Sequence, residues 1–396
     1  MTRPGTKFRA SGLIGNDRLL HGRTLGMAAY ATSKTGSIEP AERQSRLGSP
    51  RAARLAPRAA NRQSGSSTNF RRKPAMQKNL ILVANPRAMD PNDFEEIAAK
   101  IRRESRRVDA FVVTVDQPAS VIDDKVWRNP TLIVSFGQTG QFKPPRGILL
   151  HNRPIHKYQQ YVQFCLAGMN TPRTGNFTRA REYTESDWGE FCILKPADLG
   201  KMGKGGIVRL QRTRRLSAFD PAQYPLEHVF RNSRLLVQSF VDTGLRAESW
   251  RVLTLLGEPL YCFRSSSPIE RPPLDAPDDL IEKAIIEPKH PEGKQLVAYE
   301  KLRAFIADEE VMTFARQVNR AFPRIPLQGC DIVREAATGK LFILEVNPGG
   351  NTWHFSSPYF TRQRGLLGGK EAFTRQLDAF AAAARVLAMR AEQLAA

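Results

Sequence analysis

The sequence predicts a protein of mixed α/β class, and two observations lead to this prediction. Between residues 79 and 135, short apolar runs of strand length alternate with an amphipathic helical segment, which indicates parallel strands with crossover helices. Farther along the chain, two pairs of apolar runs are each joined by a short turn, which indicates antiparallel hairpins. The chain has 396 residues, so two or three domains of about 150 residues fit its length better than one.

Composition argues against several classes of protein. Hydrophobic residues make up 41% and charged residues 25% of the chain, which is ordinary for a globular protein and excludes a wholly disordered one. No uninterrupted apolar run reaches the ~18 residues of a membrane span. The four cysteines lie far apart without a CxxC pair, which argues against a zinc ribbon or a disulfide scaffold and favours a reducing compartment. We therefore expect a cytoplasmic protein without a membrane span.

Residues 1–75 differ in composition from the rest of the chain. They hold 15 Lys and Arg against 3 acidic residues, a net charge of +12 out of +21 for the whole chain. Such a segment buries too little apolar surface to offset chain entropy, so we expect it to be disordered. Three interpretations compete: a basic arm that binds polyanions such as nucleic acid, a transit peptide, or an over-extended reading frame that truly starts at Met76. We favour the third, so nucleic-acid binding by the arm is not the preferred interpretation.

A small α/β layer is predicted at residues 76–150. Residues 79–85 form a continuous apolar run that ends in Asn-Pro, which indicates a buried strand and a turn. Residues 90–107 have a helical apolar pattern, and residues 110–115 and Thr131–Ser135 are further strands. No GxGxxG follows the first strand, so the segment indicates a Rossmann-like layer without a marked dinucleotide site.

The first block that carries chemistry is the apolar strand Phe191–Pro196, which has Lys195 near its end. A glycine-rich segment follows, and it contains Gly203, Lys204, Gly205 and Gly206. Glycines let backbone N–H groups approach phosphate oxygens and lysines supply positive charge, so this block predicts phosphate binding. It does not match the Walker pattern GxxxxGK(S/T). The alternative is a flexible hairpin tip with solvated lysines.

The second block, residues 248–264, is predicted to be a hairpin that turns at residues 257–259. Arg251 opens one strand and Arg264 closes the other, so we expect the two arginines to lie near one another. Together they would form a bidentate clamp on a phosphate or a carboxylate. The alternative is a pair of exposed arginines at strand ends.

The third block is a hairpin of residues 329–335 and Leu341–Asn347, with its turn at residues 337–339. Centring the hairpin on Thr338 places Asp331 directly opposite Glu345, and period-two alternation puts Asn347 on the same face as Glu345. Two like charges that face each other cost free energy unless a cation lies between them, and oxygen ligands of this number suit Mg²⁺ held jointly with nucleotide phosphates. The alternative is a hairpin with both acids in water.

Taken in this order, the blocks resemble the ATP-grasp superfamily, and most closely its RimK-type carboxylate–amine ligase branch. The resemblance covers roughly residues 147–351, about half of the chain. It implies an ATP-grasp fold of two α+β lobes, at about residues 151–240 and 241–396, preceded by the Rossmann-like domain at residues 76–150.

The resemblance implies roles on the nucleotide side. Lys157 and Lys195 match two family lysines that contact the nucleotide phosphates, with Lys195 also on the adenine side. The segment 200–206 resembles the mobile flap that closes over the phosphates. The linker between the lobes, whose backbone pairs with the adenine edge, matches Gln238, Ser239, Phe240 and Val241. Glu248 is our choice for the acid on the ribose side, and Asp242 competes with it.

The resemblance also implies the reaction. Arg251 matches the family arginine near the γ-phosphate, and we keep Arg264 as a second catalytic arginine. Asp331, Glu345 and Asn347 match the three ligands of Mg²⁺, for which Mn²⁺ is an alternative. ATP would activate a carboxylate as an acyl phosphate, and an amine would then displace phosphate. The expected partners are small-molecule or peptide carboxylates and amines.

Other interpretations stay open. The fold also suits an ATP-dependent kinase, and a non-enzymatic protein that binds nucleotide or polyanion is a third possibility. Residues 265–279 are proline-rich and acid-bearing, where family members often carry a basic, glycine-rich passage toward the substrate. His354 is a candidate acid or base, although a packed or surface histidine is the commoner case. Residues 370–395 predict a helix packed on its own domain, with a homodimer interface as the alternative.

Overall fold

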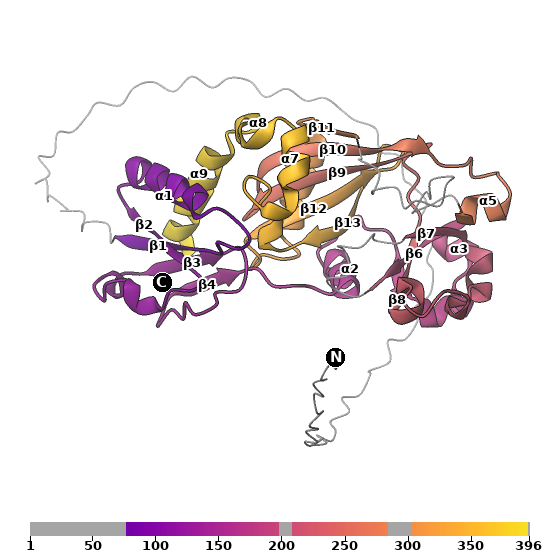
Figure 1. Cartoon of the computed structure of the whole chain (residues 1–396), viewed down its shortest axis with the longest axis horizontal. Coiled ribbons are helices and arrows are strands. Elements are labelled where there is room, and N and C mark those ends of the chain that lie inside the picture. Colours follow the sequence, from indigo (N-terminus) through magenta and orange to yellow (C-terminus); the bar gives the residue numbers. More distant parts are fainter. Residues whose placement is uncertain (1–76, 198–207, 284–301, 395–396) are drawn as a thin grey trace, which may run out of the picture. The chain divides into compact units, whose positions relative to one another are not determined.

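The computed structural model describes residues 77–197, 208–283 and 302–394. These residues form three sheets with helices packed around them, which confirms the predicted mixed α/β class (Figure 1). The arm at residues 1–75 lies outside the described residues, and so do the predicted flap residues Gly203, Lys204, Gly205 and Gly206.

The first sheet is parallel, as the alternation of strand and helix predicts. Its strands are β1 (Lys78–Ala84), β2 (Val108–Thr114), β3 (Thr131–Ser135) and β4 (Ile148–His151), in the order β2-β1-β3-β4. Helix α1 (Pro91–Glu104) crosses from β1 to β2. It begins after Asp90, whose side chain accepts a hydrogen bond from the N–H of Asn92 and so satisfies a free donor of the first turn.

The second sheet is antiparallel and follows helix α2 (Lys157–Leu166). Its strands are β5 (Thr174–Asn176), β6 (Phe191–Pro196), β7 (Arg209–Arg212) and β8 (Leu235–Ser239), in the order β5-β8-β6-β7. The short helices α3 (Glu185–Trp188) and α4 (Val229–Asn232) accompany it. Cys192 and Leu194 of β6 are buried in an apolar cluster, whereas Lys195 belongs to the other face of that strand.

The third sheet is antiparallel and carries both predicted hairpins. Its strands are β9 (Arg246–Leu255), β10 (Glu258–Glu270), β11 (Leu302–Phe305), β12 (Leu327–Arg334) and β13 (Leu341–Asn347), in the order β11-β10-β9-β12-β13. Helix α6 (Glu309–Val318) packs against one face of the sheet. The first hairpin turns at Leu256 and Gly257, whose φ angles of 52° and 90° are left-handed. The turn therefore lies one residue earlier than predicted.

The C-terminal residues form separate helices: α7 (Thr361–Leu366), α8 (Gly369–Gln376) and α9 (Ala379–Leu394). The single helix expected over residues 370–395 is interrupted at Asp378, whose φ is 46°. Helix α9 packs against α1 and the first sheet as well as β10, so the two ends of the described chain lie side by side (Figure 1). One apolar core therefore joins the first sheet to a face of the third.

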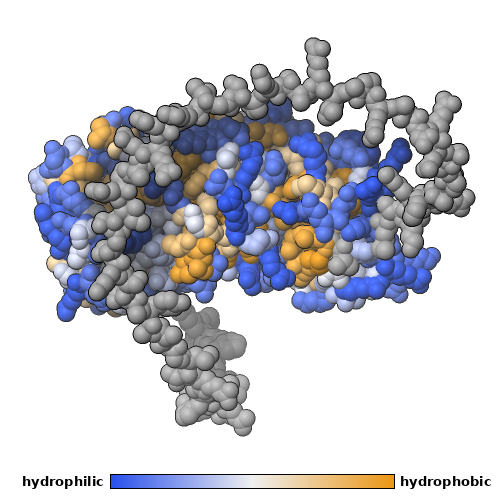
Figure 2. Space-filling model, turned by 180° about the vertical axis from the view of Figure 1, so that it is seen from behind, coloured by the Kyte–Doolittle hydropathy of each residue, from blue (hydrophilic) through white to orange (hydrophobic). Residues whose placement is uncertain are grey.

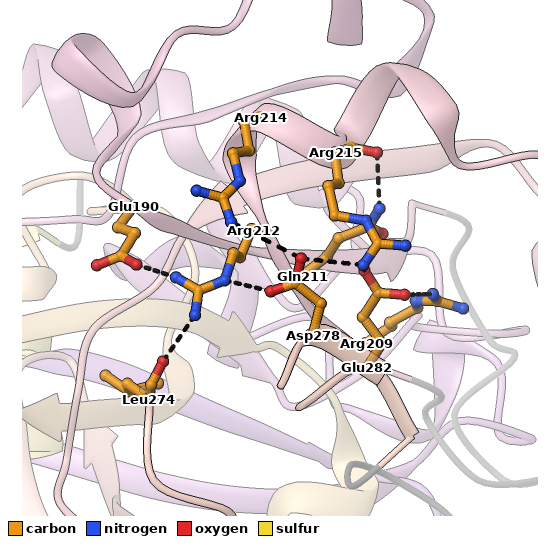
Figure 3. Close-up of polar contacts among 9 residues, drawn as sticks. All are labelled: Glu190, Arg209, Gln211, Arg212, Arg214, Arg215, Leu274, Asp278 and Glu282. Carbon is orange, nitrogen blue, oxygen red and sulfur yellow. Dashed lines mark hydrogen bonds and ion pairs between the residues drawn. The ribbon is translucent and has the colours of Figure 1, made fainter. Parts of the chain in front are cut away.

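The proline-rich passage after β10 leads into helix α5 (Asp278–Lys283), which is held to the second sheet by ion pairs (Figure 3). Arg212 of β7 binds the carboxylate of Asp278, and Arg209 Nη2 lies 2.7 Å from Glu282 Oε2. The hydrogen bond from Arg212 lowers the pKa of Asp278. Asp278 of this passage thus contacts the second sheet of the same chain.

The face of the described residues that Figure 2 shows is mostly hydrophilic, with apolar patches near its middle. Within the described residues, no helix is both long and apolar enough to span a membrane. Three of the four free cysteines are buried and Cys165 is exposed, so most of them are core residues as predicted.

Candidate active site

The hairpin of β12 and β13 builds the centre of the candidate site. Asp331 pairs with Glu345, and Gly329 pairs with Asn347, which confirms the predicted register for these residues. Between Asp331 and the turn the register shifts by one residue, since Ile332 pairs with Ile343. The prediction of an uninterrupted ladder is therefore wrong there, and β13 contains one extra residue, Leu344.

This bulge decides where Glu345 points. Leu341 and Ile343 are buried in the apolar cluster beneath the sheet, so unbroken alternation would place Glu345 in that cluster as well. Because of the extra residue, Val346 takes the buried position instead, with 1% of its surface exposed. Glu345 and Asn347 consequently lie on the opposite face, which is only partly buried.

Arg251 of β9 lies on the same face, directly opposite Asp331. Its Nε is 2.6 Å from Asp331 Oδ1, and its Nη2 donates to Asp331 Oδ2 at 2.9 Å, so the pair is bidentate. Gly329 makes room for the guanidinium, because a Cβ there would lie 2.9 Å from Arg251 Nη1 and 2.5 Å from Thr352 Cγ2. The sequence signal for this role is a glycine inside a strand, which often marks a close approach.

Asn347 lies between the two carboxylates. Its Nδ2 donates to Asp331 Oδ2 at 2.8 Å and to Glu345 Oε1 at 3.3 Å. The two acids and the amide therefore converge as the sequence predicts, but the amide directs its nitrogen, and not the expected oxygen, toward the carboxylates. The convergence excludes the alternative in which both acids simply face water.

Two lysines from other elements complete the charged cluster. Lys157, the first residue of α2, has its Nζ 3.6 Å from Glu345 Oε2. Lys195 of β6 is 8% exposed, and its Nζ donates to Gln238 Oε1 at 2.9 Å. Gln238 in turn donates to Thr174 Oγ1 at 2.9 Å, so a buried chain of hydrogen bonds holds this lysine.

The pKa values of these groups show how they influence one another. Burial lowers the pKa of Lys195 from 10.5 to about 8, and repulsion from Lys157 adds to the effect, while Glu345 and Asp331 partly oppose it. Burial alone would raise the pKa of Glu345, but attraction to Lys157, Lys195 and Arg251 outweighs it and the pKa is lowered. The cluster thus favours the ionised form of Glu345, whereas burial disfavours the charge of Lys195.

The donor set fits a divalent cation of the Mg²⁺ type. The described residues contain no cluster of three His, Cys, Asp or Glu side chains, so the protein offers two carboxylates and one amide. Mg²⁺ is commonly bound by one or two carboxylates together with substrate phosphates and water, rather than by a full protein cage. Asp331, Glu345 and Asn347 match this chemistry.

The structure does not bring every predicted residue to the site. Arg264 pairs with buried Trp250, whereas Arg251 pairs with Phe263, so the two arginines lie on opposite faces of the sheet. The expectation of a joint arginine clamp is wrong. Its physical reason is the register of the hairpin, which the turn at Leu256 and Gly257 and the bulge between Pro259 and Tyr261 set together.

Both candidates for the acid on the ribose side are paired with arginines. Glu248 Oε2 lies 3.7 Å from Arg264 Nε, and Asp242 Oδ1 accepts from Arg271 Nη2 at 2.7 Å. Neither contact selects one acid over the other, so Glu248 stays a prediction.

The predicted linker begins at the end of β8, the strand whose Gln238 binds Lys195. Gln238 and Ser239 end β8, and the N–H groups of Ser239 and Phe240 donate to the carbonyls of Arg173 and Phe191. Val241 is the next residue. The role of this linker backbone toward adenine stays a prediction.

His354 is a packed residue. It is 6% exposed, stacks on Phe360 with ring centroids 3.7 Å apart, and its Nδ1 is 2.7 Å from Tyr261 Oη. Burial lowers its pKa well below 6.5, so it is neutral near neutral pH. The packed interpretation of this histidine is confirmed.

A cavity of about 250 Å³ lies at the carboxyl ends of β1 and β3. Two of its lining residues come from the loop that follows β13, the strand that carries Glu345 and Asn347. Its lining consists of Asn85, Ala88, Met89, Phe136, Gly137, Gly349 and Asn351. The chain leaves β1 toward one edge of the sheet and β3 toward the other, so this is a topological switch point. The sequence gives no motif for it, because the cavity depends on packing of the loop after β13.

No family model and no curated protein matches this sequence. Among solved structures, the fold is similar to the D-cycloserine synthetase DcsG, with 14% identity and a TM-score of 0.41 over 78% of this chain and 99% of the other. It is also similar to the ATP-grasp ligase PsnB complexed with minimal precursor, with 14% identity and a TM-score of 0.42 over 79% and 99%. The macrocyclase MdnC, bound with precursor peptide MdnA from Microcystis aeruginosa MRC, gives 11% identity and a TM-score of 0.42 over 78% and 99%. At such scores the likeness carries no argument about activity, which depends on the site itself.

Proposed function

We propose that this chain is an ATP-grasp ligase that uses ATP and Mg²⁺ to activate a carboxylate as an acyl phosphate for attack by an amine. The observation that carries the proposal is the composition of the cluster. Among the described residues, three cations, Lys157, Lys195 and Arg251, surround two carboxylates and an amide, so this described set carries more positive than negative charge. A metal-bound polyphosphate is the kind of ligand that balances such a set.

Each side chain has a role in this proposal. Lys157 and Lys195 bind phosphate oxygens, and Gln238 keeps Lys195 oriented through its hydrogen bond. Asp331 aligns the guanidinium of Arg251 toward the transferring phosphoryl group. Asp331, Glu345 and Asn347 would hold Mg²⁺, which when bound neutralises charge on the β- and γ-phosphates.

The chemistry consists of two displacements. An oxygen of the substrate carboxylate attacks the γ-phosphorus, the bond to the bridging oxygen breaks, and ADP departs with that electron pair. The amine nitrogen then attacks the acyl carbon, phosphate leaves, and the amine proton passes to water. Positioning and charge stabilisation are sufficient for both steps, so no nucleophilic side chain is needed.

The carboxylate substrate is best placed in the cavity at the first sheet. Gly349 and Asn351 line it and follow Asn347 by two and four residues, so a short stretch of chain connects the cavity to the proposed cation ligands. Its lining is mainly apolar with the two amides of Asn85 and Asn351, which suits a small or extended substrate with a few hydrogen-bonding groups.

Nucleotide binding is tested by calorimetric titration of the full chain with ATP and Mg²⁺. We expect Lys195→Ala to abolish micromolar binding, whereas Lys143→Ala, which removes an exposed lysine, should leave it unchanged. Equal binding by both variants would contradict the assignment of the cluster as a nucleotide site.

The reaction class is tested with hydroxylamine as the amine. The full chain is incubated with ATP, Mg²⁺ and a panel of amino acids and dipeptides, and ADP and hydroxamate are measured together. A ligase forms hydroxamate in step with ADP, because hydroxylamine traps the acyl phosphate. A stable phosphorylated product without hydroxamate would contradict the ligase and favour a kinase.

A further inference from the structure

The strand that carries two of the candidate cation ligands lies at the edge of the third sheet, where β12 is its neighbour. Glu345 and Asn347 pair with Asp331 and Gly329 of β12. In an antiparallel ladder, the residue between two such pairs directs its N–H and carbonyl away from the neighbouring strand. Here that residue is Val346. Peptide groups that are buried without partners cost free energy, so this edge needs a substitute for the next strand.

Gln160 of α2 supplies that substitute. Its Oε1 accepts from the N–H of Val346 at 2.7 Å, and its Nε2 donates to the carbonyl of Val346 at 3.0 Å. The same Nε2 donates to the carbonyl of Ile155 at 3.0 Å, which ties the edge to the segment before α2. Gln160 is 4% exposed, so these hydrogen bonds are shielded from water.

We propose that Gln160 is a positioning residue of the cation site. By fixing the peptide groups of Val346, it sets the direction of Glu345 and Asn347, which flank Val346 on either side. Lys157 lies three residues earlier on the same helix, and its Nζ is 3.6 Å from Glu345 Oε2. Helix α2 therefore contacts β13 at two points: the backbone of Val346 and the carboxylate of Glu345. The inference rests on the proposed function, because it assumes that Asp331, Glu345 and Asn347 hold the cation.

The chain contains a matched control for this contact. Gln376 of α8 makes the same pair of hydrogen bonds to β10: its Nε2 donates to the carbonyl of Cys262 at 2.7 Å, and its Oε1 accepts from the N–H of Cys262 at 2.9 Å. Cys262 lies between Tyr261 and Phe263, neither of which is a cation ligand in the proposal. Removing either glutamine therefore deletes the same pair of hydrogen bonds to a strand residue, and Gln160 loses its contact with Ile155 as well. Only the pair made by Gln160 borders the ligands.

The experiment compares Gln160→Met with Gln376→Met in the full chain, since methionine keeps the side-chain volume and removes the hydrogen bonds. Binding of Mn²⁺ in the presence of ADP is followed by electron paramagnetic resonance, and melting temperature is measured in parallel. We expect Gln160→Met to weaken Mn²⁺ binding about tenfold or more, as is typical when a partner of a metal ligand is removed. Gln376→Met should change it by less than about twofold, although both variants lose stability.

The outcomes separate this inference from the proposed function. If the wild type binds no Mn²⁺ with ADP, the cation site itself fails. If the wild type binds Mn²⁺ and Gln160→Met binds it equally well, the positioning role is refuted while the site stands. Should Gln160→Met not fold, Gln160→Glu replaces it, because a carboxylate still accepts from Val346 but no longer donates. That variant should show weakened binding that higher Mn²⁺ restores, and unchanged binding would refute the role.

Discussion

The buried lysine of β6 gives a prediction that depends on pH. Burial lowers the pKa of Lys195 to about 8, so the side chain changes charge within an accessible range. Nucleotide phosphates beside Lys195 would favour its protonated form. We therefore expect affinity for ATP to decrease as pH rises through 8, at a pH where an ordinary lysine would stay charged.

The size of the effect follows from the pKa. A group of pKa about 8 is roughly 90% protonated at pH 7 and roughly 10% protonated at pH 9. If binding requires the protonated form, the dissociation constant should rise about tenfold between these values. The shift from 10.5 to about 8 corresponds to roughly 3 kcal/mol, which is the net cost of charging Lys195 in the free protein relative to water.

The same lysine affects the free protein in the opposite direction. Its pKa is lower in the folded chain than in the unfolded chain, so the unfolded chain binds more protons between about pH 8 and 10.5. The contribution of Lys195 to the free energy of unfolding therefore rises with pH in that window. Stability and ATP affinity should change in opposite senses as pH increases.

The assay is calorimetric titration with ATP at constant Mg²⁺ between pH 7 and 9, for the wild type and Lys195→Arg. An arginine stays protonated throughout, so the variant should lose the dependence that belongs to residue 195, while changes in the charge of ATP affect both proteins equally. If the wild type and Lys195→Arg show the same dependence on pH, the lowered pKa or the contact with phosphate is wrong.

Three further variants test the site and its support. Glu345→Gln should abolish turnover that depends on Mg²⁺, measured as ADP release against Mg²⁺ concentration, and unchanged turnover would remove Glu345 from the ligand set. Gly329→Ala should lower kcat at least about tenfold, because a Cβ would lie 2.9 Å from Arg251 Nη1 and displace the guanidinium; full activity in steady-state kinetics would show that the arginine position is not critical. Lys370→Met should lower the free energy of unfolding in urea by about 1–2 kcal/mol, because the carboxylate of buried Asp93 loses the cation 2.6 Å away but keeps its hydrogen bonds from Trp353 and Ser356; an unchanged free energy of unfolding would contradict this.

Much of the fold could be predicted from local pattern. The apolar runs that became β1, β3 and β6 are long enough, and bounded clearly enough, for burial to specify a strand. The pairing of Asp331 with Glu345 followed from the turn alone, since the position of a turn sets the register of its hairpin. The convergence of these two acids with Asn347 was accordingly predictable.

The errors come from bulges, which pattern alone does not locate. With the observed two-residue turn and no bulge, Arg251 and Arg264 would share a face, and the irregularity after Pro259 separates them. A proline inside a strand is a signal for such an irregularity, so this one could have been suspected. The extra residue at Leu344 has no comparable signal, because a leucine fits a regular strand as well as it fits a bulge.

Contacts between distant segments were the least predictable part. Gln160 and Val346 are 186 residues apart, and neither forms part of a motif, so their hydrogen bonds depend on how α2 packs against β13. The hydrogen bond between Lys195 and Gln238 also depends on packing, since it requires β6 and β8 to be neighbours in the sheet. Sequence patterns can name the charged residues of such a site, but its supporting amides become visible only in the fold.

The arrangement of charge gives a reason why the site needs these supports. Asp331 and Glu345 are adjacent acids that would repel one another, and each is held by a cation from a different strand or helix: Arg251 for one and Lys157 for the other. A divalent cation that enters between the acids must compete with these ion pairs, so the cost of binding depends on how little the backbone has to move. A β13 edge fixed by Gln160 keeps that cost low, because the carboxylates can exchange partners while the strand stays in place. The same reasoning implies that loosening the edge weakens cation binding even though every ligand is retained.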